Sequence, residues 1–455
     1  MKLSIIILAA GQGTRMKSQT PKVLHQLGGK ALLEHVVATV EALKPQNIEV
    51  VYGFQGEQLK KAGAKLPVHW VHQAQQLGTA HAVLQALPYC SDDNQLLILY
   101  ADVPLISENT LRKLLALTQN TVGLITAEFS DPTGLGRIIR NPAGEVRAIV
   151  EQKDASLEQL KITEINTGIL SGPVALFKEL CPQIGNKNKQ QEFYLTDLMG
   201  LLVKAGKPIV TLGVENMAEV KGVNDRWQLA ELERHHQREK ARELCLQGVT
   251  IVDPNRFDLR GELETHEDVS IDVNVIIEGK VKLGARTKIG PNVVLKNVNI
   301  GEDAMILANS IIENATIGNH SVIGPFARIR PGTQLADHVR IGNFVEVKNS
   351  EIGAHTKASH LSYIGDATIG SNVNIGAGTI TCNFDGVNKH RTIIQDDVFV
   401  GSNSSLVAPV TLEESSTIGA GSVITQTAPA KQLTLARNLQ TSISNWQRPK
   451  LKEEK

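Results

Sequence analysis

Two different spacings of hydrophobic residues divide this chain. From residue 1 to about residue 224, short aliphatic runs alternate with segments whose apolar positions follow a helical spacing. The expected strand and helix pairs are residues 5–8 and 32–43, 48–52 and 56–62, and 96–99 and 108–117. This alternation predicts a Rossmann-like α/β domain with a mainly parallel sheet. In such a domain, ligands bind beyond the carboxyl ends of the strands.

The segment from Asp225 to Gln247 has a different pattern. Its apolar residues recur every three or four positions among many charged residues, and Gly248 follows. This pattern predicts a long amphipathic helix that links two domains, with the three parts at residues 1–224, 225–248 and 249–455. Acidic and basic residues interleave between residues 234 and 242, which indicates a solvated helix face rather than a nucleic-acid patch.

A six-residue spacing begins near residue 251. Aliphatic residues followed by glycine occur at Leu283, Ile289, Ile300, Ile317, Ile323, Ile341, Ile352, Ile364, Ile369, Ile375, Val400 and Ile418. The step of six is unbroken from Ile323 to Val347 and again from Ile394 to Ile424. An α-helix would need a period near 3.6 and a half-buried strand a period of 2, so neither explains the pattern.

A repeat of six residues places one aliphatic side chain per short strand inside a prism-shaped coil. Stacked coils then share a core that no single coil could bury. The pattern predicts a parallel β-helix and resembles the left-handed hexapeptide-repeat family. Residues 376–393 interrupt the repeat and are too polar for a coil interior, so we expect them to form a loop on the functional face.

The composition narrows the classes of partner. The 455 residues include 47 basic residues (Lys and Arg) and 47 acidic residues (Asp and Glu). The chain therefore has no overall basic field that would attract nucleic acid or a membrane surface. The four cysteines form no CxxC pair, which fits a protein of the reducing cytoplasm. The apolar run at residues 3–10 is short and leads into glycines, so we interpret it as a strand rather than a signal peptide. No apolar run is long enough for a transmembrane helix.

The most specific local motif follows the first expected strand. Residues 8–16 read LAAGQGTRM, and Pro21-Lys22 comes shortly after. Glycines at 11 and 13 let backbone N–H groups approach phosphate oxygens, while Arg15 and Lys22 supply positive charge where pyrophosphate would leave. The spacing matches neither a Walker loop nor the dinucleotide fingerprint. It therefore predicts a different kind of nucleotide site.

Asp102 follows the apolar strand expected at residues 96–99. Its carboxylate therefore projects into the expected ligand crevice at the end of the sheet. A carboxylate there suits Mg²⁺, a hard cation that also binds triphosphate oxygens. We accordingly take Asp102 as a candidate metal ligand.

With these motifs in place, the N-terminal half resembles the sugar-nucleotide pyrophosphorylases. The matching residues are Leu8, Ala9, Ala10, Gly11, Lys22, Gln73, Gly78, Thr79, Tyr100, Ala101, Asp102, Gly136, Glu151, Asn166 and Asn224. The resemblance implies that Gln73, Gly78 and Thr79 pair with the uracil of UTP. It also implies that Gly136, Glu151 and Asn166 hold the sugar. Asn224 would be the second Mg²⁺ ligand, and Ala101 departs from the family's usual glycine.

Polar residues cluster near the expected coil corners of the C-terminal half. They are Arg330, Glu346, Lys348, His360, Tyr363 and Asn374. His360 lies one coil or less from Glu346 and is the candidate general base. We expect a carboxylate to fix its tautomer.

The whole chain resembles the bacterial bifunctional N-acetylglucosamine-1-phosphate uridyltransferase/glucosamine-1-phosphate N-acetyltransferase family. The resemblance makes His360 the base that takes a proton from the amine. It assigns the amino-sugar phosphate to Arg330, Lys348, Tyr363 and Asn374. It assigns acetyl-CoA to Ala377, Asn383, Phe384, Ser402, Ala420 and Arg437, with Lys389 near the phosphates of that ligand. Phe384 departs from the usual tyrosine.

The family is also trimeric, with acetyl-transfer sites built from neighbouring subunits and a basic tail at residues 437–455, including Trp446, completing them. Small-molecule substrates and a homotrimer are therefore the expected partners. Two alternatives remain at this point. One is a nucleotidyltransferase whose β-helix is only an oligomerisation scaffold, and the other is a non-catalytic regulatory subunit built from the same pair of domains.

Overall fold

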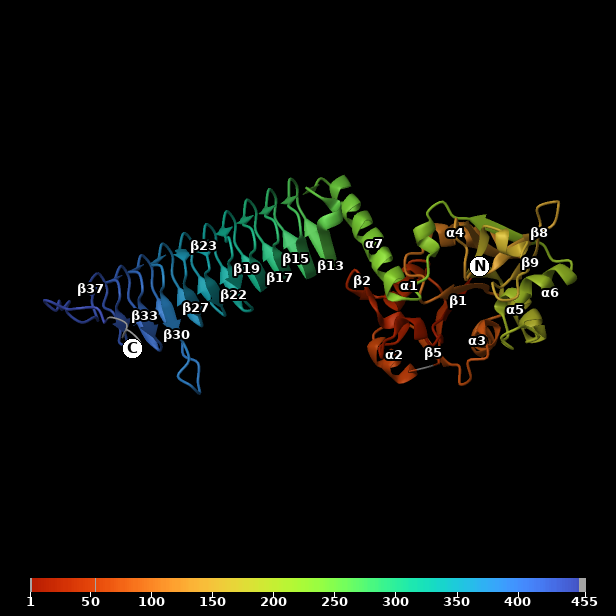
Figure 1. Ribbon diagram of the computed structural model, residues 1–455, viewed down its shortest axis with the longest axis horizontal. Helices are drawn as coiled ribbons and strands as arrows, with labels where there is room; N and C mark the ends of the chain where they lie inside the picture. Colours follow the sequence, from red (N-terminus) through yellow and green to blue (C-terminus); the bar gives the residue numbers. More distant parts are fainter. Residues whose placement is uncertain (1, 54, 450–455) are drawn as a thin grey trace, which may run out of the picture. The chain divides into compact units, whose positions relative to one another are not determined.

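The computed structural model describes residues 2–53 and 55–449. It divides into two compact units, Met1–Glu239 and Lys240–Lys455. The first unit combines strands and helices (Figure 1). Its strands form a sheet whose main order is β11-β7-β10-β6-β1-β4-β5. These strands are β1 Leu3–Leu8, β4 Asn47–Tyr52, β5 His69–His72, β6 Gln95–Tyr100, β7 Val122–Glu128, β10 Glu164–Pro173 and β11 Ile209–Gly213.

The prediction of a mainly parallel sheet is confirmed. β1 pairs in parallel with β4 and β6, and β5 and β11 are parallel to their neighbours. β10 alone reverses direction within the main order, between β6 and β7. Short antiparallel pairs join β8 (Arg137–Arg140) to β9 (Val146–Val150) and β2 (Gln26–Leu27) to β3 (Lys30–Ala31).

Helices cover both faces of the sheet, because successive strand residues point to opposite sides. Ile5 and Ile7 share a core with α1 (Leu32–Glu41) and α4 (Glu108–Leu117). Ile6 and Leu8 share another with α3 (Thr79–Ala86), α5 (Val174–Leu180) and α6 (Leu198–Lys204). A strand buried on both faces reads as a continuous apolar run. The expected helix at residues 56–62 is α2 (Gly56–Ala62).

The helix expected in the middle of the chain is α7, Arg226–Leu246. Gly248 follows it with a φ of +99°, a left-handed conformation that suits glycine at a helix end. Leu232 belongs to a small core of the first unit, whereas Leu244 packs in the core of the second. The division between the two units therefore falls within α7. In the described part of the chain, no helix combines the length and the apolar character that a membrane span requires.

The second unit is a β-helix with three faces, and all its strand pairs are parallel (Figure 1). The first face comprises β12 Thr250–Ile251, β14 Ser270–Ile271, β16 Lys288–Ile289, β18 Met305–Ile306, β20 Val322–Ile323, β23 Arg340–Asn343, β26 Lys357–His360, β29 Asn374–Ile375, β32 Phe399–Val400, β35 Thr417–Ile418 and β37 Leu433–Thr434.

Four long strands span the other two faces at the start of the β-helix: β13 Phe257–Thr265, β15 Val275–Leu283, β17 Val294–Ile300 and β19 Ile311–Ile317. The second face continues with β21 Arg328–Ile329, β24 Glu346–Lys348, β27 Tyr363–Gly365, β30 Ile380–Cys382, β33 Ser405–Val407 and β36 Val423–Ile424. The third continues with β22 Thr333–Leu335, β25 Glu351–Ile352, β28 Ala367–Ile369, β31 Thr392–Ile394 and β34 Val410–Leu412.

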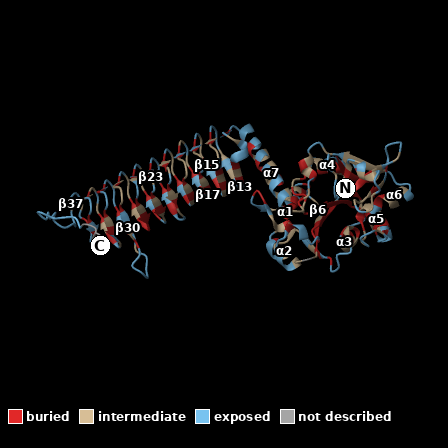
Figure 2. Cartoon of the chain, viewed as in Figure 1, coloured by how far each residue is buried: buried red, intermediate tan, exposed pale blue. Residues whose placement is uncertain are grey.

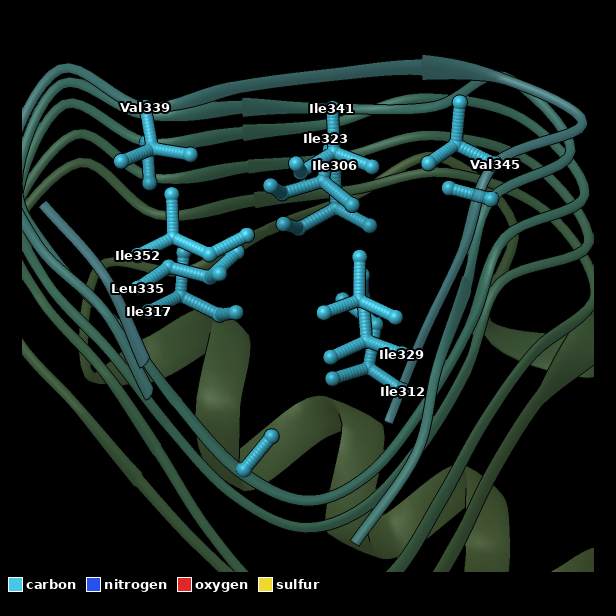
Figure 3. Close-up of a cluster of buried hydrophobic side chains, with 14 of the residues drawn as sticks. Ile306, Ile312, Ile317, Ile323, Ile329, Leu335, Val339, Ile341, Val345 and Ile352 are labelled. Carbon is cyan, nitrogen blue, oxygen red and sulfur yellow. The ribbon is translucent and has the colours of Figure 1, made fainter. Parts of the chain in front are cut away.

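The six-residue pattern identifies the core of the β-helix correctly. Every aliphatic residue predicted from it is buried. Figure 3 shows such side chains stacked inside the prism, for example Ile306, Ile323 and Ile341 from successive coils of the first face. Buried positions therefore follow the interior along the whole β-helix, and exposed positions its outside (Figure 2).

The predicted interruption at residues 376–393 is too wide. β30 continues the second face inside it, and Thr381 occupies the inward position with only 2% of its surface exposed. The Thr381 hydroxyl donates to the Gly365 carbonyl over 3.0 Å and accepts from the Gly365 N–H over 2.8 Å. A polar side chain is tolerated in the coil interior because the backbone satisfies both of its hydrogen-bonding roles. Only residues between β30 and β31 leave the coil.

Candidate active sites

One pocket of the N-terminal unit lies beyond the carboxyl ends of β1, β5 and β6. Its volume is about 520 Å³. Eleven of the predicted residues line it, namely Leu8, Ala9, Ala10, Gly11, Lys22, Gln73, Gly78, Thr79, Tyr100, Asp102 and Asn224. These residues come from separate stretches of sequence, and the parallel strands bring them to one edge of the sheet, where α/β proteins bind ligands.

Lys22 brings a positive charge into this pocket. Its ammonium forms an ion pair with the Asp102 carboxylate and lies 3.4 Å from Asn224 Oδ1. Backbone pairing supports this arrangement, since the Val223 N–H donates to the Asp102 carbonyl over 2.9 Å. The two candidate metal ligands therefore converge on one positive charge.

Gln73 and Gly78 form a fixed wall of the pocket. Gln73 is buried, and its amide nitrogen donates to the Gly78 carbonyl over 3.2 Å. Gly78 has a φ of +119°, and a Cβ there would lie 2.5 Å from the backbone oxygen of Phe193. Only glycine therefore fits this turn at the start of α3. The Thr79 hydroxyl accepts from the Leu195 N–H over 2.9 Å, which ties the same wall to the 193–195 segment.

Gly136, Glu151 and Asn166 lie outside the pocket lining but close to one another. The Asn166 N–H donates to the Gly136 carbonyl over 2.9 Å, and a Cβ on Gly136 would lie 3.3 Å from Glu151 Oε1. Burial raises the pKa of Glu151, and the charges of Asp154 and Asp197 act in the same direction. The three predicted sugar residues thus form one cluster with a partly desolvated carboxylate.

Tyr100 connects this cluster to the pocket. Burial raises the pKa of its phenol, and the negative charges of Glu151 and Asp102 add to the effect. Its ring also lies against Gly168, where a Cβ would come within 2.4 Å of it. The phenol therefore stays neutral and can donate a hydrogen bond. Two other predicted residues do not line the pocket. Ala101 is fully buried, and Arg15 is an exposed residue of the 3₁₀ turn Thr14–Met16.

In the β-helix, His360 belongs to a column of residues at one corner of successive coils. The same backbone hydrogen bond recurs along this column. The carbonyl of each column residue accepts from an N–H in the next coil, and that N–H belongs to the residue directly after the next column residue. The column runs through Asn343, His360, Ala377, Ser402 and Ala420. Three of the predicted acetyl-CoA residues thus share a column with the candidate base, although they are far apart in the sequence.

The prediction that a carboxylate contacts His360 is wrong. His360 Nδ1 lies 2.7 Å from the side-chain oxygen of Asn343. Glu346 lies on the second face and bonds instead to Arg330, with 2.7 Å between Arg330 Nη1 and Glu346 Oε1. The reason is the register, because Glu346 pairs with Tyr363 in the ladder whereas Asn343 pairs with His360.

Several of the other predicted residues meet on the second face. Asp366 is buried, and its carboxylate accepts from the side-chain amides of Asn349 at 2.6 Å and Asn383 at 2.5 Å. Burial opposes ionisation of Asp366, but these two hydrogen bonds lower its pKa. The Asn383 amide also lies 3.5 Å from the Tyr363 hydroxyl. Asp366 therefore fixes the side chain of Asn383.

Two lysines lie side by side next to this network. The Lys348 side chain interacts directly with that of Lys389, and the resulting repulsion lowers the pKa of Lys389. The Asp366 carboxylate offsets part of that repulsion. Two neighbouring ammonium groups concentrate positive charge at this place on the surface. Lys389, which is expected to bind acetyl-CoA, thus lies next to Lys348, which is expected to bind the amino-sugar phosphate.

Phe384 and Lys389 pair across the short hairpin that leaves the coil. Asp385 caps this hairpin: hydrogen bonds from the Asn388 and Val387 N–H groups and from His390 hold its pKa well below the usual range. Phe384 is 60% exposed. The hairpin thus presents an aromatic ring and a lysine on a fixed turn.

Two other predicted residues lie off the second face. Asn374 lies on the first face, in β29, whereas Arg330 and Tyr363 lie on the second. Arg437 follows the last strand and donates to the Ala420 carbonyl over 2.8 Å. Trp446 is 63% exposed, and residues 450–455 of the expected tail lie outside the described residues.

Known proteins resemble both units. The MobA-like NTP transferase domain family matches residues 5–160, the GMPPB C-terminal domain matches residues 259–360, and the hexapeptide repeat of succinyl-transferase matches residues 391–426. "Bifunctional protein GlmU" of Legionella pneumophila (strain Paris) is 53% identical over 459 residues, which cover 100% of both chains. The proteins of that name from Marinobacter nauticus and Alkalilimnicola ehrlichii are 51% and 50% identical, over 98% of this chain and 99% and 96% of theirs. This chain belongs to the GlmU family.

The GlmU family assignment accounts for both units together. The chain combines a nucleotidyltransferase domain with a hexapeptide-repeat acyltransferase domain in one bifunctional protein. Each unit carries its own group of candidate residues, one in the pocket of the α/β unit and one on the outside of the β-helix.

Sequence reasoning missed several residues of this GlmU-family pocket. Val23, Gln76, Ala82 and Glu192 also line it. Val23 adjoins Lys22, and Ala82 lies one helical turn after Thr79, so proximity to a motif was a usable signal. Glu192 had no such signal. It reaches the pocket because Phe193 pairs with the backbone of Leu77 and Ala80.

Proposed function

We propose that this chain carries out two successive transfers. The β-helix transfers an acetyl group from acetyl-CoA to the amine of glucosamine-1-phosphate. The α/β unit then transfers a uridylyl group from UTP to N-acetylglucosamine-1-phosphate and releases pyrophosphate. The observation that carries this proposal is the end-to-end similarity to relatives named bifunctional GlmU, 53% identical over 100% of both chains. Residues 1–224 and 249–455 are the two catalytic domains, and residues 225–248 link them.

Uridylyl transfer proceeds by in-line attack in the N-terminal pocket. A phosphate oxygen of the sugar phosphate bonds to the α-phosphorus of UTP while the bond to the β-phosphate oxygen breaks, so no covalent enzyme intermediate forms. Lys22 and Arg15 supply positive charge to the leaving pyrophosphate. Gln73, Gly78 and Thr79 hold the uracil against the rigid wall that their hydrogen bonds form.

The sugar cluster has complementary chemistry. Glu151 accepts hydrogen bonds from sugar hydroxyls or the acetamido N–H, and the Asn166 side chain and the Gly136 backbone complete the subsite. The neutral phenol of Tyr100 lies between this subsite and Asp102. Polar groups that are partly buried before the sugar arrives discriminate strongly, because an analogue that lacks the matching hydroxyl leaves them unpaired.

Asp102 and Asn224 fit a Mg²⁺ ion. Mg²⁺ prefers oxygen ligands and is usually held by one or two protein groups together with substrate phosphates. Both side chains already converge on one cation, the Lys22 ammonium. Within residues 2–53 and 55–449, no group of three or more His, Cys, Asp or Glu side chains could hold a metal, so phosphate oxygens must complete this site. When bound, the ion neutralises charge on the phosphate oxygens.

Acetyl transfer uses His360 as a general base. The amine nitrogen attacks the thioester carbonyl, its proton moves to His360 Nε2, and the C–S bond breaks as coenzyme A leaves and takes up that proton. Arg330, Lys348, Tyr363 and Asn374 bind the sugar phosphate. The small side chains of Ala377, Ser402 and Ala420 continue from His360 along one corner and accommodate acetyl-CoA, with Asn383, Phe384, Lys389 and Arg437 beside it.

We propose that the protein is a cytoplasmic homotrimer. Two observations support an assembly. Asn374 lies on a different face from Tyr363, so neighbouring copies would complete each site. Phe326 and Phe344 stack at 5.2 Å on one corner, are 49% and 56% exposed, and have positive φ values. Positive φ values recur at many positions along the β-helix, so it is the exposed aromatic pair that fits a surface that another chain covers.

The test supplies purified protein with glucosamine-1-phosphate, acetyl-CoA, UTP and Mg²⁺. UDP-N-acetylglucosamine is the expected product, and its absence would refute the proposal. His360→Ala should abolish thiol release from acetyl-CoA and leave pyrophosphate release from UTP and N-acetylglucosamine-1-phosphate intact. His266→Ala, an exposed histidine in the first coils of the same β-helix, is the control and should change neither activity.

A further inference from the structure

The His360 ring lies within hydrogen-bond distance of a residue to which the family resemblance assigns no role. Asn343 ends β23 and His360 ends β26, and the parallel ladder pairs them directly. The Asn343 side-chain oxygen lies 2.7 Å from His360 Nδ1. We infer that Asn343 is a positioning residue for acetyl transfer, which holds the imidazole in the tautomer that can act as a base. This inference rests on the proposed role of His360.

The chemistry of the two groups gives the contact a definite direction. An amide oxygen only accepts hydrogen bonds, so the nitrogen facing it must carry a proton. In a neutral imidazole with the proton on Nδ1, Nε2 has a free lone pair and can take the proton of the attacking amine. The opposite tautomer has its proton on Nε2 and cannot accept another there. Asn343 therefore selects the productive form.

The other neighbours of His360 are not placed to orient its ring, which leaves this role to Asn343. Its neighbour in the next coil of the same column is Ala377, whose methyl group offers no hydrogen bond. Glu346, the nearby carboxylate, is engaged by Arg330 on the adjacent face. An amide also differs from a carboxylate in bringing no negative charge to the base. The pair therefore orients the ring without a formal ion pair.

The test compares Asn343→Ala with Asn343→Asp in the full chain. Asn343→Ala should lower kcat for acetyl transfer by about 10–100-fold, the range found when the group that orients a metal-binding histidine is removed. KM for glucosamine-1-phosphate and acetyl-CoA should stay unchanged. Asn343→Asp retains an oxygen acceptor at the same place and should recover most of the lost kcat. Asn299→Ala, an exposed asparagine on β17, is the matched control and should behave like the parent.

Three results would overturn the inference: an unchanged kcat in Asn343→Ala, an equal loss in Asn343→Asp, or a loss of kcat accompanied by raised KM values and a lower melting temperature. Uridylyl transfer, measured on the same samples, should remain at the parental level in all variants. His360→Ala is assayed in parallel. If His360→Ala keeps acetyl transfer, the proposed function itself is refuted. If His360→Ala loses acetyl transfer while Asn343→Ala turns over normally, only the role of Asn343 is refuted.

Discussion

The Lys22 ammonium and the Asp102 carboxylate form an ion pair across the N-terminal pocket, although 80 residues separate them in the sequence. Asn224 Oδ1 lies 3.4 Å from the same ammonium. The lysine therefore occupies the place on which the two candidate Mg²⁺ ligands converge. When UTP and the metal bind, Lys22 would exchange Asp102 for phosphate oxygens, and the ion would take its place beside the carboxylate.

This relationship predicts opposite effects of one substitution. Lys22→Gln should tighten the binding of Mg²⁺ alone about tenfold or more, because a competing positive charge is removed from Asp102. It should also lower kcat for uridylyl transfer about 100-fold or more, because the leaving pyrophosphate loses a preorganised cation. Calorimetric titration with MgCl₂ and a pyrophosphate-release assay measure the two effects.

Asp102→Asn is the companion variant in that experiment. It should weaken Mg²⁺ binding and uridylyl transfer together and leave acetyl transfer unchanged. Equal Mg²⁺ affinity in Lys22→Gln and the parent would contradict the competition between the lysine and the metal.

Two glycines of the same pocket should respond differently to alanine. Gly78→Ala places a Cβ 2.5 Å from the Phe193 backbone oxygen at a φ of +119°. It should lower the free energy of unfolding by about 1–3 kcal/mol and raise KM for UTP. Gly11 has an ordinary φ and no atom within 4 Å of a new Cβ, so Gly11→Ala should leave stability unchanged and affect only UTP binding.

Denaturant melts and steady-state kinetics separate these two glycine effects. Gly185→Ala, also in open space with an ordinary φ, should be neutral in both measurements. A Gly78→Ala protein as stable as the parent would show that the wall around Gln73 is not rigid.

Glu151 should make the N-terminal unit less stable as the pH rises. Burial, together with Asp154 and Asp197, raises its folded-state pKa above the unfolded value of about 4.3. The folded state therefore binds more protons between those two pKa values, and stability falls as the pH increases through that window. Glu151→Gln has no charge to desolvate and should be more stable than the parent at pH 7. The difference should disappear below about pH 4.

Glu151→Gln should also raise KM for N-acetylglucosamine-1-phosphate about tenfold or more, because a charge-assisted hydrogen bond to the sugar is lost. Thermal melts between pH 4 and pH 8 and uridylyl-transfer kinetics measure the two effects. Greater stability of the parent at pH 7 would contradict the desolvation of Glu151. A variant that gained stability and kept its KM would leave Glu151 without a role in sugar binding.

Thr381→Val tests how the β-helix accepts a polar residue in its interior. The six-residue pattern favours an aliphatic side chain at this position, yet valine would leave the Gly365 N–H without the hydroxyl that now binds it at 2.8 Å. We expect Thr381→Val to lose about 1–3 kcal/mol of stability. Thr411→Val, in the partly exposed middle of β34, is the control and should stay close to the parent. A stabilised Thr381→Val would mean that the hydrophobic pattern outweighs the hydrogen bonds.

The sequence alone determined the architecture of both units. Alternating aliphatic runs and helical segments identified β1, β4 and β6 with the helices that follow them, and the six-residue period identified the buried residues of the β-helix. These features can be predicted from the sequence because the spacing of buried residues follows the local geometry of each helix, strand or coil. Each element therefore has its own hydrophobic period.

Only the tertiary structure decided which side chains meet. Asn343, not Glu346, contacts His360, because the register between successive coils places residues 17 positions apart beside each other. Glu192 enters the nucleotide pocket through backbone pairing of a distant loop, and Thr381 fits a core position because Gly365 satisfies its hydroxyl. A hydrophobic period specifies which side chains turn inward. Hydrogen bonds are short and directional, so the pairing of polar groups depends on register and loop geometry that no local pattern encodes.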